Sequence, residues 1–97
     1  MSELVFLPEA RAEFDNGADW YEERQPGLGT RFTLAVNAVL ERVAQNPKMH
    51  QVVLDDARKA VIRGFPYCVY YRADGDSVVV LSVFHTSRDP AEWQRRV

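Results

Sequence analysis

The sequence has little cysteine and no long apolar segment. These two absences argue against a disulfide-stabilised protein and against a membrane-spanning protein. Cys68 is the single cysteine among 97 residues, so an internal disulfide is excluded, as is usual for a reducing compartment. No stretch approaches the roughly 20 apolar residues that span a bilayer. Residues 1–9 lack the positive region and apolar core of a signal peptide. We therefore expect a cytoplasmic protein that does not enter a membrane.

Motifs for metals, phosphates and acyl transfer are also missing. No spacing of His, Cys, Asp or Glu matches a metal site, and Asp55-Asp56 is more typical of a solvated turn than of a ligand pair. The chain has neither a Gly-rich phosphate loop nor a serine elbow. We expect no metal and no other cofactor.

The charge is small overall and unevenly divided. Residues 1–57 contain 5 Lys or Arg and 10 Asp or Glu, whereas residues 58–97 contain 7 and 4, within a total of −2. This division predicts either two faces for different partners or scattered solvated charge. Neither half has the basic density of a strong nucleic-acid binder, so we expect no direct specific DNA binding by this chain alone.

The first half of the chain predicts a strand followed by two helices. Leu4–Leu7 is a short apolar run, and Pro8 suits the first position of a helix whose acidic residues are expected to be solvated: Glu9, Glu13, Asp19, Glu22 and Glu23. Residues 25–27, Gln-Pro-Gly, break the pattern. A second helix then has apolar residues at helical spacing and ends at Asn46-Pro47. Its apolar positions are Phe32, Ala35, Val36, Val39, Leu40 and Val43.

The second half predicts strands. Residues 59–63 and 67–73 are two candidates, and Asp74-Gly75 is a two-residue hairpin signal. Residues 77–84 are nearly all apolar and predict a central strand that is covered on both faces. The expected architecture is one α+β domain over residues 1–97, in the order β-α-α-β-β-β, with a short C-terminal helix possible around Trp93.

Three strings in this order resemble toxins of the RelE/ParE family, most closely its ParE-like members. They are WYEERQPGLG at residues 20–29, RGFPYCVYY at residues 63–71 and VLSVFHTSRDP at residues 80–90. The resemblance implies a small twisted antiparallel sheet with an α-helical hairpin on one face. It also implies the toxin component of a type II toxin-antitoxin system, whose partner is a cognate antitoxin protein.

The resemblance leaves two activities open, because some family members cleave messenger RNA on the ribosome and ParE members inhibit DNA gyrase. Cys68 stands where the nuclease members have an Arg, and Val61 stands where they have the second of two basic residues. Trp93 and Gln94 lie where some of them have a Tyr. We therefore expect a non-enzymatic gyrase inhibitor that acts by protein binding.

Two alternatives remain at this point. A ribosome-dependent, metal-independent messenger-RNA endonuclease would use His85, Arg88 and Arg63. A degenerate member would bind an antitoxin without being toxic. His85 could equally be a structural residue at a strand end, and Arg88 could brace the tail helix.

The remaining candidates concern partners. Aromatic and aliphatic residues gather near the break between the helices, and we expect them to bind the antitoxin. They are Trp20, Tyr21, Leu28 and Phe32. Cations of the second half are the candidates for contact with the target: Arg58, Arg63 and Arg88. Cys68 and the neighbouring tyrosines are expected to pack within strands.

Overall fold

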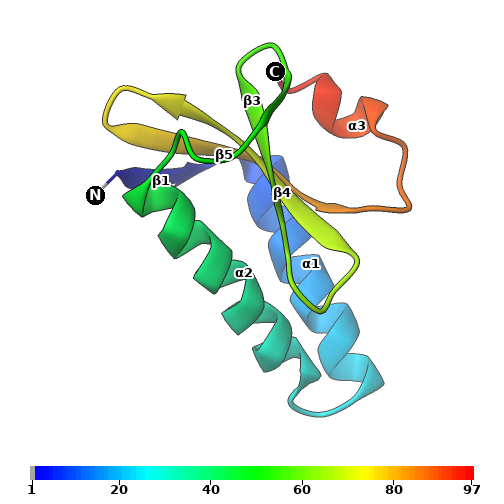
Figure 1. Ribbon diagram of the computed structural model, residues 1–97. Helices are drawn as coiled ribbons and strands as arrows, with labels where there is room; N and C mark the ends of the chain where they lie inside the picture. Colours follow the sequence, from blue (N-terminus) through cyan, green and yellow to red (C-terminus); the bar gives the residue numbers. More distant parts are fainter. Residues whose placement is uncertain (1) are drawn as a thin grey trace.

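A computed structural model describes residues 2–97 and has a mixed sheet with helices on both faces (Figure 1). The elements are β1 (Glu3–Phe6), α1 (Pro8–Arg24), α2 (Leu28–Gln45), β2 (Val52–Leu54), β3 (Ala57–Val61), β4 (Tyr67–Asp74), β5 (Ser77–His85) and α3 (Ala91–Gln94). None of the helices in this part of the chain is long and apolar enough to cross a membrane.

The sheet has five strands in the order β1-β5-β4-β3-β2. Its pairs are antiparallel except that β1 runs parallel to β5. The predicted α+β class and helical hairpin are confirmed. The prediction of an antiparallel sheet was wrong for one pair, β1 and β5. Strand β2 was not predicted, since three residues are too few to show an alternating pattern.

Strand β5 lies inside the sheet and is buried from Val78 to Phe84, as its apolar sequence predicted. The hairpin that joins it to β4 turns at Gly75-Asp76, one residue later than predicted, because Asp74 still pairs with Ser77. Gly75 has a φ of 60°, which a residue without a Cβ adopts at little cost.

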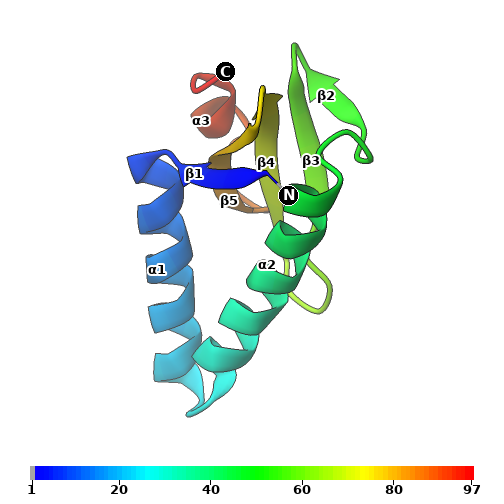
Figure 2. The ribbon, with the colours of Figure 1, turned by 90° about the vertical axis from the view of Figure 1, so that its left-hand side faces the viewer.

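The two long helices cover one face of the sheet and extend beyond its end (Figures 1 and 2). The apolar residues of α2 meet the sheet as predicted, with Phe32, Val36 and Val43 fully buried. At their connection, the Glu22 carboxylate accepts hydrogen bonds from the amides of Gly27 (2.9 Å) and Gly29 (3.0 Å). A Cβ at Gly29 would lie 2.5 Å from the Ala18 carbonyl oxygen, so this glycine allows the helices to approach closely.

A smaller core lies on the opposite face of the sheet and is closed by α3. Trp93 is stacked on Tyr70, with ring centroids 3.7 Å apart and an interplanar angle of 11°. Cys68 is buried in this core, where burial raises the pKa of its thiol and keeps it protonated. The prediction that Cys68 is buried is confirmed.

The outer strands are shorter than their inner neighbours, so parts of two inner strands have no neighbouring strand on one side. Strand β1 pairs with β5 only from Ser77 to Val80, so residues 81–85 have no strand beside them on the side of α1. Strand β2 pairs with β3 no further than Arg58, apart from one bond from the Lys59 amide to the Gln51 carbonyl. We call these the α1 edge (residues 81–85) and the α2 edge (from Val61 to Arg63).

Candidate partner-binding groove

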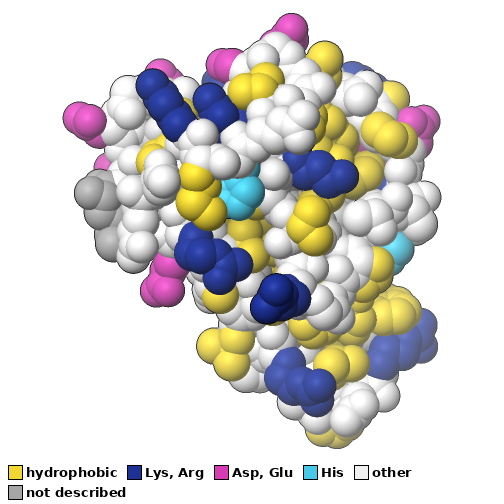
Figure 3. Space-filling view, in the orientation of Figure 1, with side chains coloured by type: hydrophobic (Ala, Val, Ile, Leu, Met, Phe, Trp, Pro, Cys, Tyr) yellow, Lys and Arg dark blue, Asp and Glu magenta, His cyan; other side chains and the backbone are white. Residues whose placement is uncertain are grey.

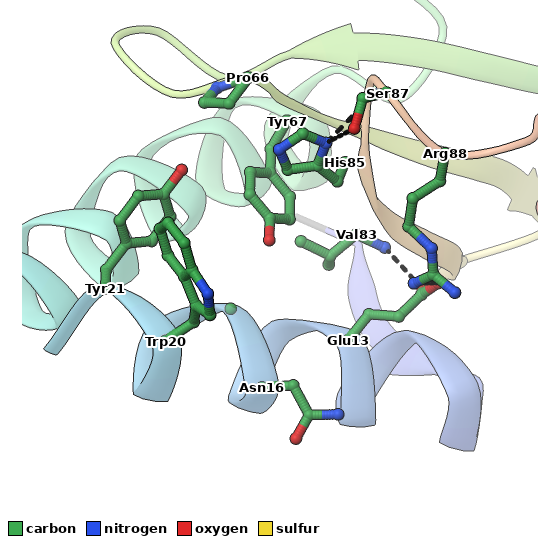
Figure 4. Close-up of a pocket in the computed structure, with 11 residues that line it drawn as sticks. Glu13, Asn16, Trp20, Tyr21, Pro66, Tyr67, Val83, His85, Ser87 and Arg88 are labelled. Carbon is green, nitrogen blue, oxygen red and sulfur yellow. Dashed lines mark hydrogen bonds and ion pairs between the residues drawn. The ribbon is translucent and has the colours of Figure 1, made fainter. Parts of the chain in front are cut away.

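A groove of about 570 Å³ lies between α1 and the end of β5, beside the α1 edge (Figure 4). Residues of α1 form one wall, and the ends of β4 and β5 with the turn after β5 form the other. The lining residues are Glu13, Asn16, Gly17, Trp20, Tyr21, Pro66, Tyr67, Val83, His85, Ser87 and Arg88. We call this hollow the α1 groove.

Two of the four residues that we expected to bind an antitoxin line this groove. Trp20 is 50% exposed and its ring meets Tyr21 edge-on at 5.1 Å between centroids. The Arg24 guanidinium lies 4.3 Å from the Trp20 ring centroid on the same helix. A half-exposed indole that is already held by two neighbours can bury apolar area at a small entropic cost.

The other two expected residues do not belong to this surface. Phe32 has no exposed surface, because it packs at the centre of the aromatic cluster beneath the groove. Its ring meets Tyr21 at 5.1 Å and Tyr67 at 4.8 Å. Leu28 begins α2 and does not line the groove. Phe32 as a direct contact residue was therefore wrong, since its helical stripe faces the core.

The groove carries two phenol groups, those of Tyr21 and Tyr67. Burial raises the pKa of Tyr21 and of Tyr67, so both hydroxyls stay protonated at neutral pH. A protonated phenol can donate and accept a hydrogen bond. The groove therefore combines aromatic surface with a few polar groups that can orient a bound segment.

The Glu13 carboxylate bonds to the α1 edge at Ser82 and Val83. Its Oε1 accepts hydrogen bonds from the Val83 amide (3.2 Å) and the Ser82 hydroxyl (2.8 Å). Arg96 pairs with both carboxylate oxygens, at 2.8 and 3.1 Å, and donates to the Leu81 carbonyl at 3.0 Å. This ion pair thus replaces the strand that β5 lacks beyond Val80.

This network was not predicted from the sequence. Glu13 was expected among the solvated residues, but its side chain is only 10% exposed, because it bonds to β5 and the C-terminal tail. The available signal was Ser82, a polar residue within an apolar strand, which needs a partner once it is buried. Nothing local pointed to Arg96 as part of the same network.

His85 and Arg88 lie in the groove, and both are engaged by neighbours. The Nδ1 atom of His85 accepts from the Ser87 amide at 3.1 Å and lies 2.7 Å from the Ser87 hydroxyl (Figure 4). This is the structural role at a strand end that we considered for His85. Arg88 forms an ion pair with Glu92 of α3 and lies 3.9 Å from Glu13, so it braces the tail helix.

The two other cationic candidates lie elsewhere. Arg58 donates to the carbonyls of Lys48 (3.2 Å) and His50 (2.6 Å), so it holds the loop between α2 and β2. Arg63 lines a separate hollow of about 340 Å³ with Arg42 and Val61. The structure thus brings Arg88 and His85 together and leaves Arg63 apart from them.

A family model described as the ParE toxin of the type II toxin-antitoxin system parDE matches residues 4–90. The chain belongs to the ParE toxin family. Among solved structures, a chain of the chromosomal ParDE TA system from P. aeruginosa matches with a TM-score of 0.66 and 17% identity, over 90% of this chain and 98% of that one. No curated protein matches the sequence.

Membership of the ParE family agrees with the resemblance found in the three sequence strings. It does not identify the molecule that the chain acts on. The structural match supports the fold, at an identity too low to carry function. No cluster of three or more His, Cys, Asp or Glu within residues 2–97 could hold a metal ion.

Proposed function

We propose that this chain is the toxin of a toxin-antitoxin pair, that it acts by binding DNA gyrase, and that it does not cut RNA. The observation that carries the proposal is the engagement of the nuclease candidates. His85 Nδ1 is bonded to Ser87, and Arg88 is paired with Glu92. Arg63, the third member of that set, lines a different hollow.

Cleavage of a phosphodiester needs a proton acceptor, a proton donor and cations around one phosphate. In the α1 groove the Glu13 carboxylate lies near Arg88 and reduces its effective charge toward a phosphate. A binding toxin needs only a shaped surface, and the groove with its half-exposed Trp20 provides one.

The same groove is our proposal for the site of the cognate antitoxin. Its aromatic wall and floor suit the apolar face of an amphipathic helix, which buries side chains at helical spacing in such a groove. Trp20 and Tyr21 would be the principal contacts. An antitoxin of this kind is disordered when alone and orders on binding.

The test compares two activities of the purified chain. Gyrase supercoiling and trapped cleaved DNA are measured in one assay, and cleavage of ribosome-bound message is measured in another. We expect inhibition of gyrase with intact message, and equal inhibition by the His85→Ala variant. Site-specific cutting of message that His85→Ala abolishes would replace the proposal by the nuclease alternative. A chain inactive in both assays that still binds its antitoxin would be the degenerate member.

A further inference from the structure

The charge of the molecule is segregated along the chain. Residues 31–72, which contain most of α2 and of strands β2 to β4, hold seven Lys or Arg and three Asp or Glu. The rest of the chain holds five and eleven. In Figure 3 the Lys and Arg side chains spread over the face that α2 and β3 help to form, and the Asp and Glu side chains lie toward its rim. One face is therefore basic although the whole chain carries a net charge of −2.

The cations of residues 31–72 are not neutralised within the chain. Every ion pair in the part of the chain that the structure describes involves Arg11, Arg88 or Arg96, which all lie outside this segment. A cation without an internal counter-charge keeps its full charge for a partner, so this face attracts anionic molecules.

Two of these cations stand on one side of α2. Arg31 and Arg42 are eleven positions apart, which brings them within about 20° of each other around the helix and about 16 Å apart along it. Ala35 and Ala38 occupy the same side between them. Small side chains at these two positions let a long anion approach the helix between the two guanidinium groups. We call these four residues the α2 row.

Further cations lie beside the α2 row. Arg63 lines the same hollow of about 340 Å³ as Arg42. Arg58 also lies near Arg42, because both act on one neighbour: burial lowers the pKa of His50, and Arg42 and Arg58 lower it further. We call the α2 row together with Arg58 and Arg63 the basic surface. It combines cations from α2, from β3 and from the turn after β3.

The residues of the basic surface select its class of anion. All four cations are arginines, whose planar guanidinium groups donate paired hydrogen bonds to phosphate oxygens. Only alanines stand between Arg31 and Arg42 on the α2 row, and they offer little apolar area to a protein segment. A phosphate backbone needs no apolar contact, and a nucleic-acid duplex presents roughly ten phosphates over the length of the row.

A duplex fits this surface better than a single strand does. Proteins hold single strands by stacking the bases on aromatic side chains. The large apolar residues that are exposed within residues 31–72 include no aromatic residue; they are Leu34, Met49, Val52, Val53 and Val61. The bases of a duplex are already stacked on each other, so cations alone suffice to hold it.

We propose that the basic surface binds the phosphate backbone of duplex DNA, and that it contacts the DNA that gyrase holds. The second part rests on the proposed function, and the first part does not. Contacts to phosphates carry no base information, so this binding is independent of sequence. The acidic rest of the chain weakens DNA binding by the free protein. On gyrase, the DNA is held beside the bound toxin, and the high effective concentration compensates for this weakness.

The first experiment measures binding of the full chain to a labelled duplex of about 30 base pairs by fluorescence anisotropy, at ionic strengths from about 20 to 150 mM. R31Q and R42Q each remove one phosphate contact. Each should therefore weaken binding about tenfold at low salt, and reduce the steepness of log affinity against log salt by about one. The double variant R31Q/R42Q should lose about a hundredfold. Glutamine is a good helix former, and thermal unfolding checks that each variant folds.

The matched control is R95Q, which removes an exposed arginine at the end of α3, across the sheet from α2. It should change the affinity for the duplex less than about threefold and leave the salt dependence unchanged.

The second experiment measures inhibition of supercoiling by the same variants. R31Q/R42Q should need at least about tenfold more protein than the wild type for the same inhibition, because it loses its contacts with the DNA. Its binding to gyrase in the absence of DNA should equal that of the wild type. R95Q should inhibit like the wild type.

Several results would overturn the basic surface. These are an absence of duplex binding at about 20 mM salt, equal losses in R42Q and R95Q, and tighter binding of an oligothymidine than of the duplex. Displacement of the duplex by polyglutamate at equal charge would assign the surface to an acidic protein instead. A chain that binds DNA through Arg31 and Arg42 but leaves gyrase active would refute the proposed function alone. A chain that inhibits gyrase equally without these arginines would refute the contact with gyrase-held DNA alone.

Discussion

The α1 edge and the α2 edge pose the same structural problem and solve it differently. At both, an outer strand is too short to pair with its longer neighbour, and a helix runs beside the exposed backbone. At the α1 edge the chain supplies its own partner, since Glu13 and Arg96 bond to Val83 and Leu81. At the α2 edge nothing in residues 2–97 bonds to the backbone of Val61 on that side.

The difference shows that one edge of a small sheet can stabilise the fold while another edge remains available to bind a partner. A bonded edge contributes to the folded state and resists pairing with other chains, whereas an open edge beside cations is available to a partner. Charge follows the same division. The α1 side is acidic and its ion pairs are internal, and the α2 side is basic and its cations face outward.

The largest effect on stability is expected when the α1 edge loses the Glu13 carboxylate, which bonds there in place of a strand. Glu13→Ala leaves Arg96 without its carboxylate and the Val83 amide without an acceptor, so we expect a loss of roughly 3–5 kcal/mol in the free energy of unfolding. Urea unfolding measures it. The control is Asp15→Ala, which breaks the exposed ion pair with Arg11 on the same helix and should cost less than about 1 kcal/mol. Equal losses would mean that Glu13 is not a structural partner of β5.

A second prediction concerns the α1 groove. Trp20→Ala should weaken binding of the cognate antitoxin by about 2–4 kcal/mol, because a half-exposed indole at a groove is typical of a binding hot spot. Isothermal titration calorimetry measures the change. Val61→Ala, which also removes an exposed apolar side chain, is the matched control at the other edge and should leave this affinity nearly unchanged. The opposite ranking would move the antitoxin to the α2 edge.

Hydrogen exchange compares the two edges without any substitution. The Val83 amide donates to Glu13 and the Val61 amide has no backbone partner within residues 2–97, so Val83 should exchange roughly a hundredfold or more slowly. Both amides belong to valines in strands, so the difference between their intrinsic rates is small. Two-dimensional NMR in deuterated solvent resolves them. Similar protection of the two amides would show that the α2 edge is closed in solution.

The smallest effect concerns pH and His50, near the α2 edge. Its pKa is lowered from the ordinary value of 6.5, first by burial and then by Arg42 and Arg58. The unfolded chain therefore binds a proton on His50 at a higher pH than the folded chain does. Stability from this residue is present above pH 6.5 and is lost as the pH falls through the folded value. His50→Gln should flatten that part of the profile of unfolding free energy against pH, and R42E should reduce it.

The local pattern of residues in the sequence was enough to predict the two long helices and the central strand β5. Pro8 begins α1, Asn46 caps the end of α2, and the apolar run from Val78 to Val80 can only be buried on both faces. Local pattern was not enough to separate the aromatic residues near the hairpin. Trp20 and Phe32 have similar apolar character, but one is half exposed and the other has no exposed surface. Their difference depends on which stripe of each helix meets the sheet.

By itself, the sequence determined the helices, every strand except β2, the order of these elements and the family resemblance, because these depend on side-chain periodicity, turn residues and short strings within a few positions. The tertiary structure alone decided the lengths of the paired edges and the assignment of each charge to a partner or to solvent. Glu13 and Arg96 meet across 83 positions of chain, and Arg42 and Arg63 line one hollow from two elements. No local pattern encodes such pairings, since they arise only when the helices pack on the sheet and leave part of β3 and β5 uncovered.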